Sequence, residues 1–93
     1  MAFSLTFRPG AVQDFEALPA KVQARIAQTI EALGLNPFYP NTRALQGNLW
    51  PFRRARVGDY RIIYLPDPEQ QRVTIIAIGL RSDIYKRLSR MSG

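Results

Sequence analysis

The sequence contains no cysteine and no histidine among its 93 residues. Without cysteine there can be no disulfide and no thiolate nucleophile, and without histidine there is no imidazole base. The usual transition-metal sites, which depend on these two residue types, are excluded for the same reason. We therefore expect a protein without cofactor or metal, whose chemistry depends on charged, amide and hydroxyl side chains.

Long hydrophobic runs are also missing. No apolar stretch approaches the roughly 20 residues that a membrane-spanning helix requires. The N-terminus shows no charged lead-in, apolar segment or cleavage site of a secretory signal. We therefore expect a cytoplasmic protein without a membrane partner, and a chain of 93 residues predicts a single domain over residues 1–93.

Acidic residues are few, with 7 Asp and Glu against 13 Lys and Arg and a net charge of +6. Most of the basic residues are arginines, whose planar guanidinium donates two parallel hydrogen bonds to a phosphate or carboxylate. This excess favours a nucleic acid or an acidic protein as partner. A basic surface that is merely solvated is the alternative, and charge alone does not separate the two.

Hydrophobic periodicity predicts one strand followed by two helices in the first part of the chain. Residues 2–7 alternate apolar and polar side chains, as in a half-buried strand. Apolar residues at helical spacing predict a short helix after Pro9-Gly10 and a second helix over 20–33, with Gly34 as its C-cap. So little chain joins these helices that we expect an antiparallel hairpin.

The second part of the chain predicts an antiparallel meander. Residues 52–65 are typical of two strands joined at Gly58-Asp59 by a type II′ turn. A strand over 72–78 and a short basic helix over 82–90 follow, whereas the segments 36–41 and 45–48 have loop composition.

The complete prediction is an α+β fold: an N-terminal strand, an antiparallel helical hairpin, a three-stranded antiparallel meander completing a twisted sheet, and a short C-terminal helix. We expect the helices to lie on one face of the sheet. Alternation places Tyr60 and Tyr64 in the core beneath the helices. Trp50 and Phe52 could stack on nucleotide bases, but packing against a loop is the stronger interpretation.

Five residues are candidates for a functional site. Arg54 and Arg56 share one face of their strand, and alternation in the next strand places Arg61 beside them. Three guanidinium groups are thus expected on an open, concave sheet surface, where Arg81 and Tyr85 could add a further cation and a phenol. Such a cluster favours a phosphate or carboxylate ligand, with a solvated basic face as the alternative.

Two sequence blocks resemble the RelE/ParE toxin superfamily. Residues 56–64 (RVGDYRIIY) are similar to the central hairpin of that superfamily, and residues 79–85 (GLRSDIY) to its C-terminal G-x-R-x-x-x-Y ending. Leu45-Gln46-Gly47 and the helical hairpin also agree, so the resemblance spans nearly the whole chain. It implies the RelE-like microbial RNase fold and membership of a type II toxin–antitoxin system.

RelE-type members cleave messenger RNA on the ribosome, through attack of a ribose 2′-hydroxyl on the neighbouring phosphate and without a metal. The resemblance implies that Arg54 and Arg56 bind the substrate and that Arg61 grips the scissile phosphate. It also implies that Arg81 supports the leaving group and that Tyr85 orients or stacks on the nucleotide. Fixed cations suit this reaction because negative charge builds up on the phosphorane.

Two positions depart from the pattern of the superfamily. Leu80 stands where many relatives have a histidine or lysine, so a possible proton-transfer group is missing. Tyr85 is the only obvious replacement, since arginine keeps its proton at neutral pH. Arg53 stands where relatives usually have an apolar residue that faces the helices.

The resemblance leaves three functions open and implies specific partners. The first function is a ribosome-dependent endoribonuclease, the second a ParE-like inhibitor of DNA gyrase without nuclease activity, and the third a member that only binds its partner and regulates transcription. The implied partners are a small acidic cognate antitoxin, the ribosome and messenger RNA. The toxin–antitoxin complex is expected to bind operator DNA through the antitoxin.

Overall fold

The computed structural model describes residues 2–38 and 41–92 of the chain. The described residues form one sheet, three α-helices and a short 3-10 helix. In chain order the elements are β1 (Ser4–Phe7), α1 (Pro9–Glu16), α2 (Ala20–Leu35), β2 (Thr42–Ala44), η1 (Gly47–Leu49), β3 (Arg53–Val57), β4 (Tyr60–Asp67), β5 (Arg72–Leu80) and α3 (Arg81–Ser92). The predicted α+β class is confirmed.

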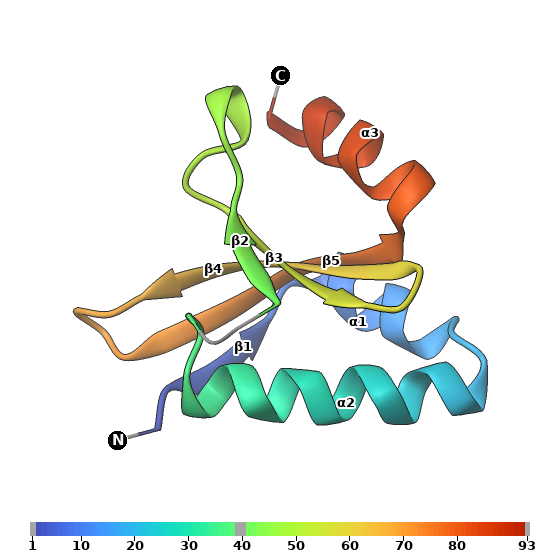
Figure 1. Cartoon of the computed structure of the whole chain (residues 1–93), viewed down its shortest axis with the longest axis horizontal. Coiled ribbons are helices and arrows are strands. Elements are labelled where there is room, and N and C mark those ends of the chain that lie inside the picture. Colours follow the sequence, from blue (N-terminus) through green and yellow to red (C-terminus); the bar gives the residue numbers. More distant parts are fainter. Residues whose placement is uncertain (1, 39–40, 93) are drawn as a thin grey trace.

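The sheet has the strand order β1-β5-β4-β3-β2 (Figure 1). β1 runs parallel to β5, and every other neighbouring pair is antiparallel. The meander predicted from the second part of the chain is confirmed as β3, β4 and β5. Its first turn has a positive φ of 58° at Gly58 but none at Asp59, as a type II′ turn requires.

The helices α1 and α2 cover one face of the sheet and lie below it in Figure 1. α2 directs Ile26, Ile30 and Leu33 into the interface at the spacing that its sequence predicts. Together with the strands they form the main core, whose buried members are Ala11, Ile26, Ile30, Leu33, Ala55, Val57, Ile62, Tyr64, Val73, Ile75 and Ile78. The predicted burial of Tyr64 is confirmed, and Tyr60 packs against the same core.

Gly34 does not cap α2, because the helix continues to Leu35. A Cβ atom at Gly34 would lie 3.4 Å from the side chain of Leu5, and the backbone N–H of Phe3 donates to the Gly34 carbonyl at 2.6 Å. The close approach of the first strand to α2 therefore explains the glycine, whereas the end of the helix does not.

The expectation that all helices lie on one face is wrong for α3, which covers the opposite face. Ile84 and Leu88 of this helix pack against the strands in a second core, whose buried members are Ile63, Ile76, Ala77, Ile84 and Leu88. A bulge between β4 and β5 leaves Ile76 without a Cα partner, so both Ile76 and Ala77 join this core. The central strands are apolar on both faces, so their alternation cannot show which face the last helix covers.

A fifth strand, β2, lies between the predicted loop segments 36–41 and 45–48. β2 pairs with β3 over only three residues, too few to show a period of two. The predicted loop residues 39 and 40 lie outside the described residues. Beyond β2, Phe52 packs against the second core as expected, whereas Trp50 is 70% exposed and its predicted packing is wrong.

Candidate nucleic-acid interface

Three arginines, Arg54 and Arg56 of β3 and Arg61 of β4, lie on the face of the sheet opposite α1 and α2. Ala55 and Val57 are buried in the main core, so the alternate residues Arg54 and Arg56 point to the other side. Arg56 is the cross-strand partner of Arg61, which shares its face. The predicted grouping of three arginines on one face is confirmed.

A fourth arginine joins this group from β2. Arg43 pairs with Arg54 across the two strands, so both point to the same face. Sequence reasoning missed Arg43 because β2 is too short to be recognised. We call the surface formed by Arg43, Arg54, Arg56 and Arg61 the arginine face.

The arginine face contains two like-charge pairs opposite each other across the strands, Arg43 with Arg54 and Arg56 with Arg61. Like charges in this arrangement destabilise a sheet unless an anion compensates them. Within the described part of the chain, none of the four forms an ion pair with a carboxylate. The face therefore suits an anionic ligand that spans two neighbouring strands.

Arg61 departs from the expected open position, because only 7% of the residue is exposed. Its Nη1 donates to the carbonyl oxygens of Gly58 and Tyr60, both at 2.9 Å. The side chain thus folds back onto the turn between β3 and β4. Arg56 is exposed and Arg54 is half-buried, so the three guanidinium groups differ in their access to a ligand.

Arg81, the first residue of α3, is exposed next to this turn. Its backbone N–H donates to the carbonyl oxygen of Asp59 at 2.8 Å, which links the start of α3 to the β3–β4 turn. A shallow pocket of about 240 Å³ lies here and is lined by Asp59, Leu80, Arg81 and Ser82. The fold therefore brings Arg81 close to the turn that Arg61 supports, although the two residues are far apart in the chain.

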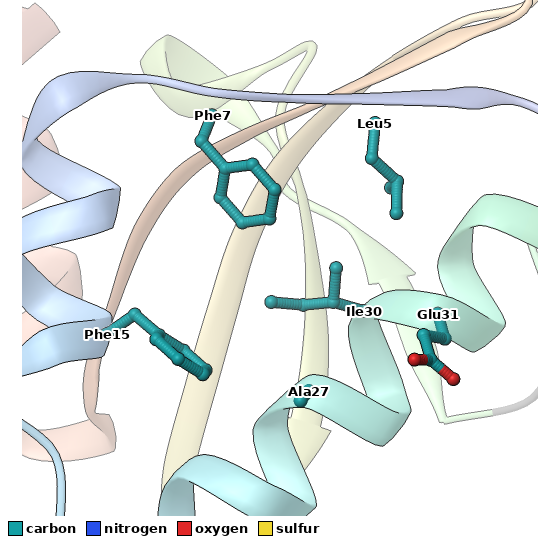
Figure 2. Close-up of a pocket in the computed structure, with 6 residues that line it drawn as sticks. All are labelled: Leu5, Phe7, Phe15, Ala27, Ile30 and Glu31. Atoms are coloured by element: carbon teal, nitrogen blue, oxygen red, sulfur yellow. The ribbon is translucent and has the colours of Figure 1, made fainter.

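The opposite face of the sheet carries a groove of a different kind. Between β1 and the two helices lies an apolar groove of about 250 Å³, lined by Leu5, Phe7, Phe15, Ala27, Ile30 and Glu31 (Figure 2). Leu5 and Phe7 remain partly exposed, because β1 is the edge strand and no described strand lies beyond it. With one carboxylate and no cation in its lining, this groove does not suit a phosphate ligand.

Comparison with known proteins identifies the family. The model of the ParE toxin of the type II toxin–antitoxin system parDE matches residues 5–85. The chain belongs to the RelE/ParE superfamily of type II toxins. Two relatives from Mycobacterium tuberculosis are similar to this toxin. Toxin RelE is 34% identical over 76 residues, which cover 82% of this chain and 78% of the relative. Toxin RelG is 31% identical over 91 residues, which cover 94% and 100%.

Solved structures of the superfamily share the fold of this toxin. The RelBE2 toxin–antitoxin complex from Mycobacterium tuberculosis superposes with a TM-score of 0.80 and 26% identity over 89% of this chain and 95% of the other. The isolated Escherichia coli RelE toxin has a TM-score of 0.74 over 97% and 98% of the two chains, with 21% identity. The predicted RelE-like fold is therefore confirmed.

The two departures from the superfamily pattern have different structural consequences in this toxin. Arg53 faces the helices, where its guanidinium lies 5.0 Å from the centre of the Phe38 ring. It also donates to the hydroxyls of Tyr64 at 3.3 Å and Thr42 at 3.0 Å, which makes Arg53 part of the packing beside the main core. Leu80, by contrast, is exposed beside Arg81 and lines the shallow pocket.

Tyr85 of α3 lies partly in the second core and partly at the surface. It lies four residues after Arg81, about one helical turn further along α3, and is half-buried against the second core. Its ring therefore helps to anchor α3 on the sheet.

The described part of the chain has no group of three acidic side chains that could hold a metal ion. None of its helices is long and apolar enough to cross a membrane.

Proposed function

We propose that this toxin is a ribosome-dependent endoribonuclease that cleaves messenger RNA. The observation that carries the proposal is the arginine face, with its paired and uncompensated cations, next to Arg81 at the β3–β4 turn. A single-stranded RNA backbone presents phosphates in succession, which suits cations spread over neighbouring strands. The similarity to toxins named RelE supports the same activity.

In the proposed reaction, a ribose 2′-hydroxyl attacks the adjacent phosphate and the 5′-oxygen of the next nucleotide leaves. Arg54 and Arg56 hold the message, and Arg61 grips the scissile phosphate. Arg81 stabilises the charge that develops on the leaving oxygen. These cations accelerate cleavage because they interact more strongly with the phosphorane than with the bound substrate.

Arg61 can serve both the turn and the substrate. Both of its hydrogen bonds use Nη1, whereas a guanidinium carries five N–H donors. Nε and Nη2 remain to donate to a phosphate while Nη1 keeps the turn in place. A guanidinium held in this way is preorganised, so little reorientation is needed when the substrate binds.

The reaction also requires that the attacking 2′-hydroxyl lose its proton and that the leaving 5′-oxygen gain one. Leu80 contributes no acid or base and arginine keeps its proton at neutral pH, so the Tyr85 hydroxyl, one helical turn after Arg81, is our candidate for proton transfer. We propose that Tyr85 orients or stacks on the nucleotide. The ribosome then supplies in-line geometry for the attack, which by itself contributes a large part of the rate.

The test is message cleavage in a translation reaction with intact ribosomes, followed by primer extension. The wild-type toxin should cleave the message, and Arg81→Ala should reduce cleavage by about a hundredfold or more, as expected for loss of a transition-state donor. Arg72→Ala is the matched control, because Arg72 is an exposed arginine at the far end of β5. Full cleavage by Arg81→Ala would contradict the assigned site.

An assay of DNA supercoiling by gyrase, with the same preparations, distinguishes gyrase inhibition from message cleavage. Intact messages together with loss of gyrase supercoiling would replace the nuclease proposal with gyrase inhibition. If messages and supercoiling were both unaffected at matched protein levels, the third function, antitoxin binding and transcriptional regulation alone, would be favoured.

We further propose that a small acidic antitoxin binds this toxin and that the complex binds operator DNA through the antitoxin. The solved complex of RelBE2 supports a partner of this kind, and the net charge of +6 favours an acidic one. Affinity for the antitoxin should fall as salt rises, measured by calorimetry between low and high ionic strength. An affinity indifferent to salt would contradict the electrostatic part of this proposal.

A further inference from the structure

An ion pair between Asp14 and Arg87 joins the two faces of the sheet around its edge. Arg87 Nη2 lies 3.0 Å from Asp14 Oδ2 and 3.1 Å from Oδ1. It is the only ion pair among residues 2–38 and 41–92, although the sequence has 13 basic and 7 acidic residues. Asp14 belongs to α1 below the sheet, and Arg87 belongs to α3 above it (Figure 1).

Asp14 also completes the hydrogen bonding of β5. The parallel partner strand ends at the pair of Phe7 with Ile75, so the outer edge of β5 has no strand of the described residues beyond that point. There the backbone N–H of buried Ile78 donates to Asp14 Oδ2 at 3.0 Å. A carboxylate from α1 thus takes the place of a strand, which prevents a buried donor from remaining unpaired.

Arg87 of α3 contacts the same residue of β5, Ile78, from the opposite face of the sheet. Its Nη1 lies 3.5 Å from the carbonyl oxygen of Ile78, while Nη2 contacts the Asp14 carboxylate. One guanidinium therefore bridges α1, the edge of β5 and α3. The side chains are 17% exposed for Asp14 and 40% for Arg87, so solvent screens this contact only in part.

The contact determines where α3 lies relative to the arginine face. Within residues 81–90 only Ile84 and Leu88 are buried, with Tyr85 half-buried beside them, so few apolar contacts fix the position of this short helix. The N-terminus of the helix is tied to Asp59, and Arg87 supplies a second polar anchor further along it. Arg81 and Tyr85 lie at or between these two anchors.

Gly79 permits this arrangement. A Cβ atom at Gly79 would lie 3.2 Å from Ile84 Cδ1 and 3.3 Å from Arg87 Nη1. A side chain at this position would crowd both contacts, and each neighbour would have to move by a few tenths of an ångström. The small residue at position 79 therefore lets α3 lie close to β5, with Ile84 and Arg87 both in contact range.

We propose that Asp14 and Arg87 are positioning residues that hold α3, and with it Arg81, in register with the arginine face. The proposal rests on the proposed endoribonuclease function, because it assigns the pair a role in aligning Arg81 with the scissile phosphate. In this proposal neither residue has to touch the substrate. Both act through the position of the helix.

Asp14→Asn and Arg87→Lys test the pair with little change in shape. The first substitution retains an oxygen for the Ile78 N–H but removes the negative charge, and the second retains the positive charge but removes the planar fork. Glu16→Gln is the matched control, because Glu16 is an exposed carboxylate on the same helix. In translation reactions we expect each pair variant to lower kcat about tenfold with little change in KM, whereas Glu16→Gln stays at the wild-type rate.

Combination with other variants separates positioning from mere stabilisation. Because the pair acts through Arg81, Arg81→Ala should lower kcat by a clearly smaller factor in the Asp14→Asn background than in the wild type. Arg54→Ala, which removes a cation of β3, should lower kcat by the same factor in both backgrounds. If both combinations were additive, or if the pair variants kept full kcat, the positioning role would be overturned.

Hydrogen exchange of the purified toxin tests the helix position without any activity assay. In both pair variants we expect the amides of α3 to exchange at least about tenfold faster, while those of β4 and α2 keep their protection. If the wild type did not cleave messages, the proposed function would fail, but faster exchange confined to α3 would still establish the anchoring. Unchanged exchange in α3, or equally faster exchange throughout the domain, would refute it.

Discussion

The two faces of the sheet differ in apolar burial and in charge. Among the residues whose burial the structure describes, the face toward α1 and α2 has eleven in the main core, whereas the face toward α3 has five in the second core and carries the arginine face as well. A small domain has only enough apolar surface for one substantial core. When that core lies on one side of the sheet, the other side can keep guanidinium groups accessible to a ligand.

The largest effect should come from placing a charge in the main core. Ile26 is fully buried beneath the sheet, so Ile26→Asp would bury a carboxylate without a partner and should leave the domain largely unfolded. Circular dichroism and thermal denaturation measure this. Gln28→Asp, at an exposed position of the same helix, is the control, and an unchanged melting temperature for Ile26→Asp would show that α2 is misplaced.

The difference between the two cores can be measured with one substitution. Leu33 and Leu88 are both buried to within 1% exposure, one in each core. Leu→Ala replacements in cores cost about 2–5 kcal/mol, with the cost set by how far the surroundings relax. We expect Leu33→Ala near the upper end of that range and Leu88→Ala near the lower end in urea denaturation. Equal costs would mean that the second core is as rigid as the first.

Arg61 of the arginine face and Arg81 of α3 should differ in how much each contributes to stability. Arg61→Ala removes a buried side chain and its bonds to two turn carbonyls, so we expect a loss of about 1–3 kcal/mol in the free energy of unfolding. Arg81→Ala, at an exposed site, should change it by less than about 0.5 kcal/mol. Message cleavage should fall in both variants. A fully stable Arg61→Ala would show that Nη1 does not support the turn.

The smallest effect should come from Tyr85→Phe. The ring packs against the second core, and the substitution deletes only the hydroxyl, so stability should stay within about 0.5 kcal/mol of the wild type. Cleavage near the wild-type rate would confine Tyr85 to orienting or stacking. A large loss of kcat with unchanged KM would instead assign the hydroxyl to proton transfer.

The sequence by itself determined the features that depend on short-range pattern. Helical spacing predicted the stripe Ile26, Ile30 and Leu33, and the Gly58-Asp59 turn followed from the backbone freedom of glycine. Cross-strand register across that turn was enough to place Arg56 and Arg61 on one face. The resemblance to the RelE/ParE superfamily rested on the same segment together with residues 79–85.

Only the tertiary structure decided the features that depend on partners distant in the chain. β2 exists because β3 offers it an edge, and three residues contain too little pattern to predict a strand. The face covered by α3 could not be predicted, because both faces of the central strands are apolar and the bulge at Ile76 interrupts the alternation of β5. The burial of Arg61 and the ion pair of Asp14 with Arg87 follow from the folded geometry, since a side chain of either type would be exposed by default.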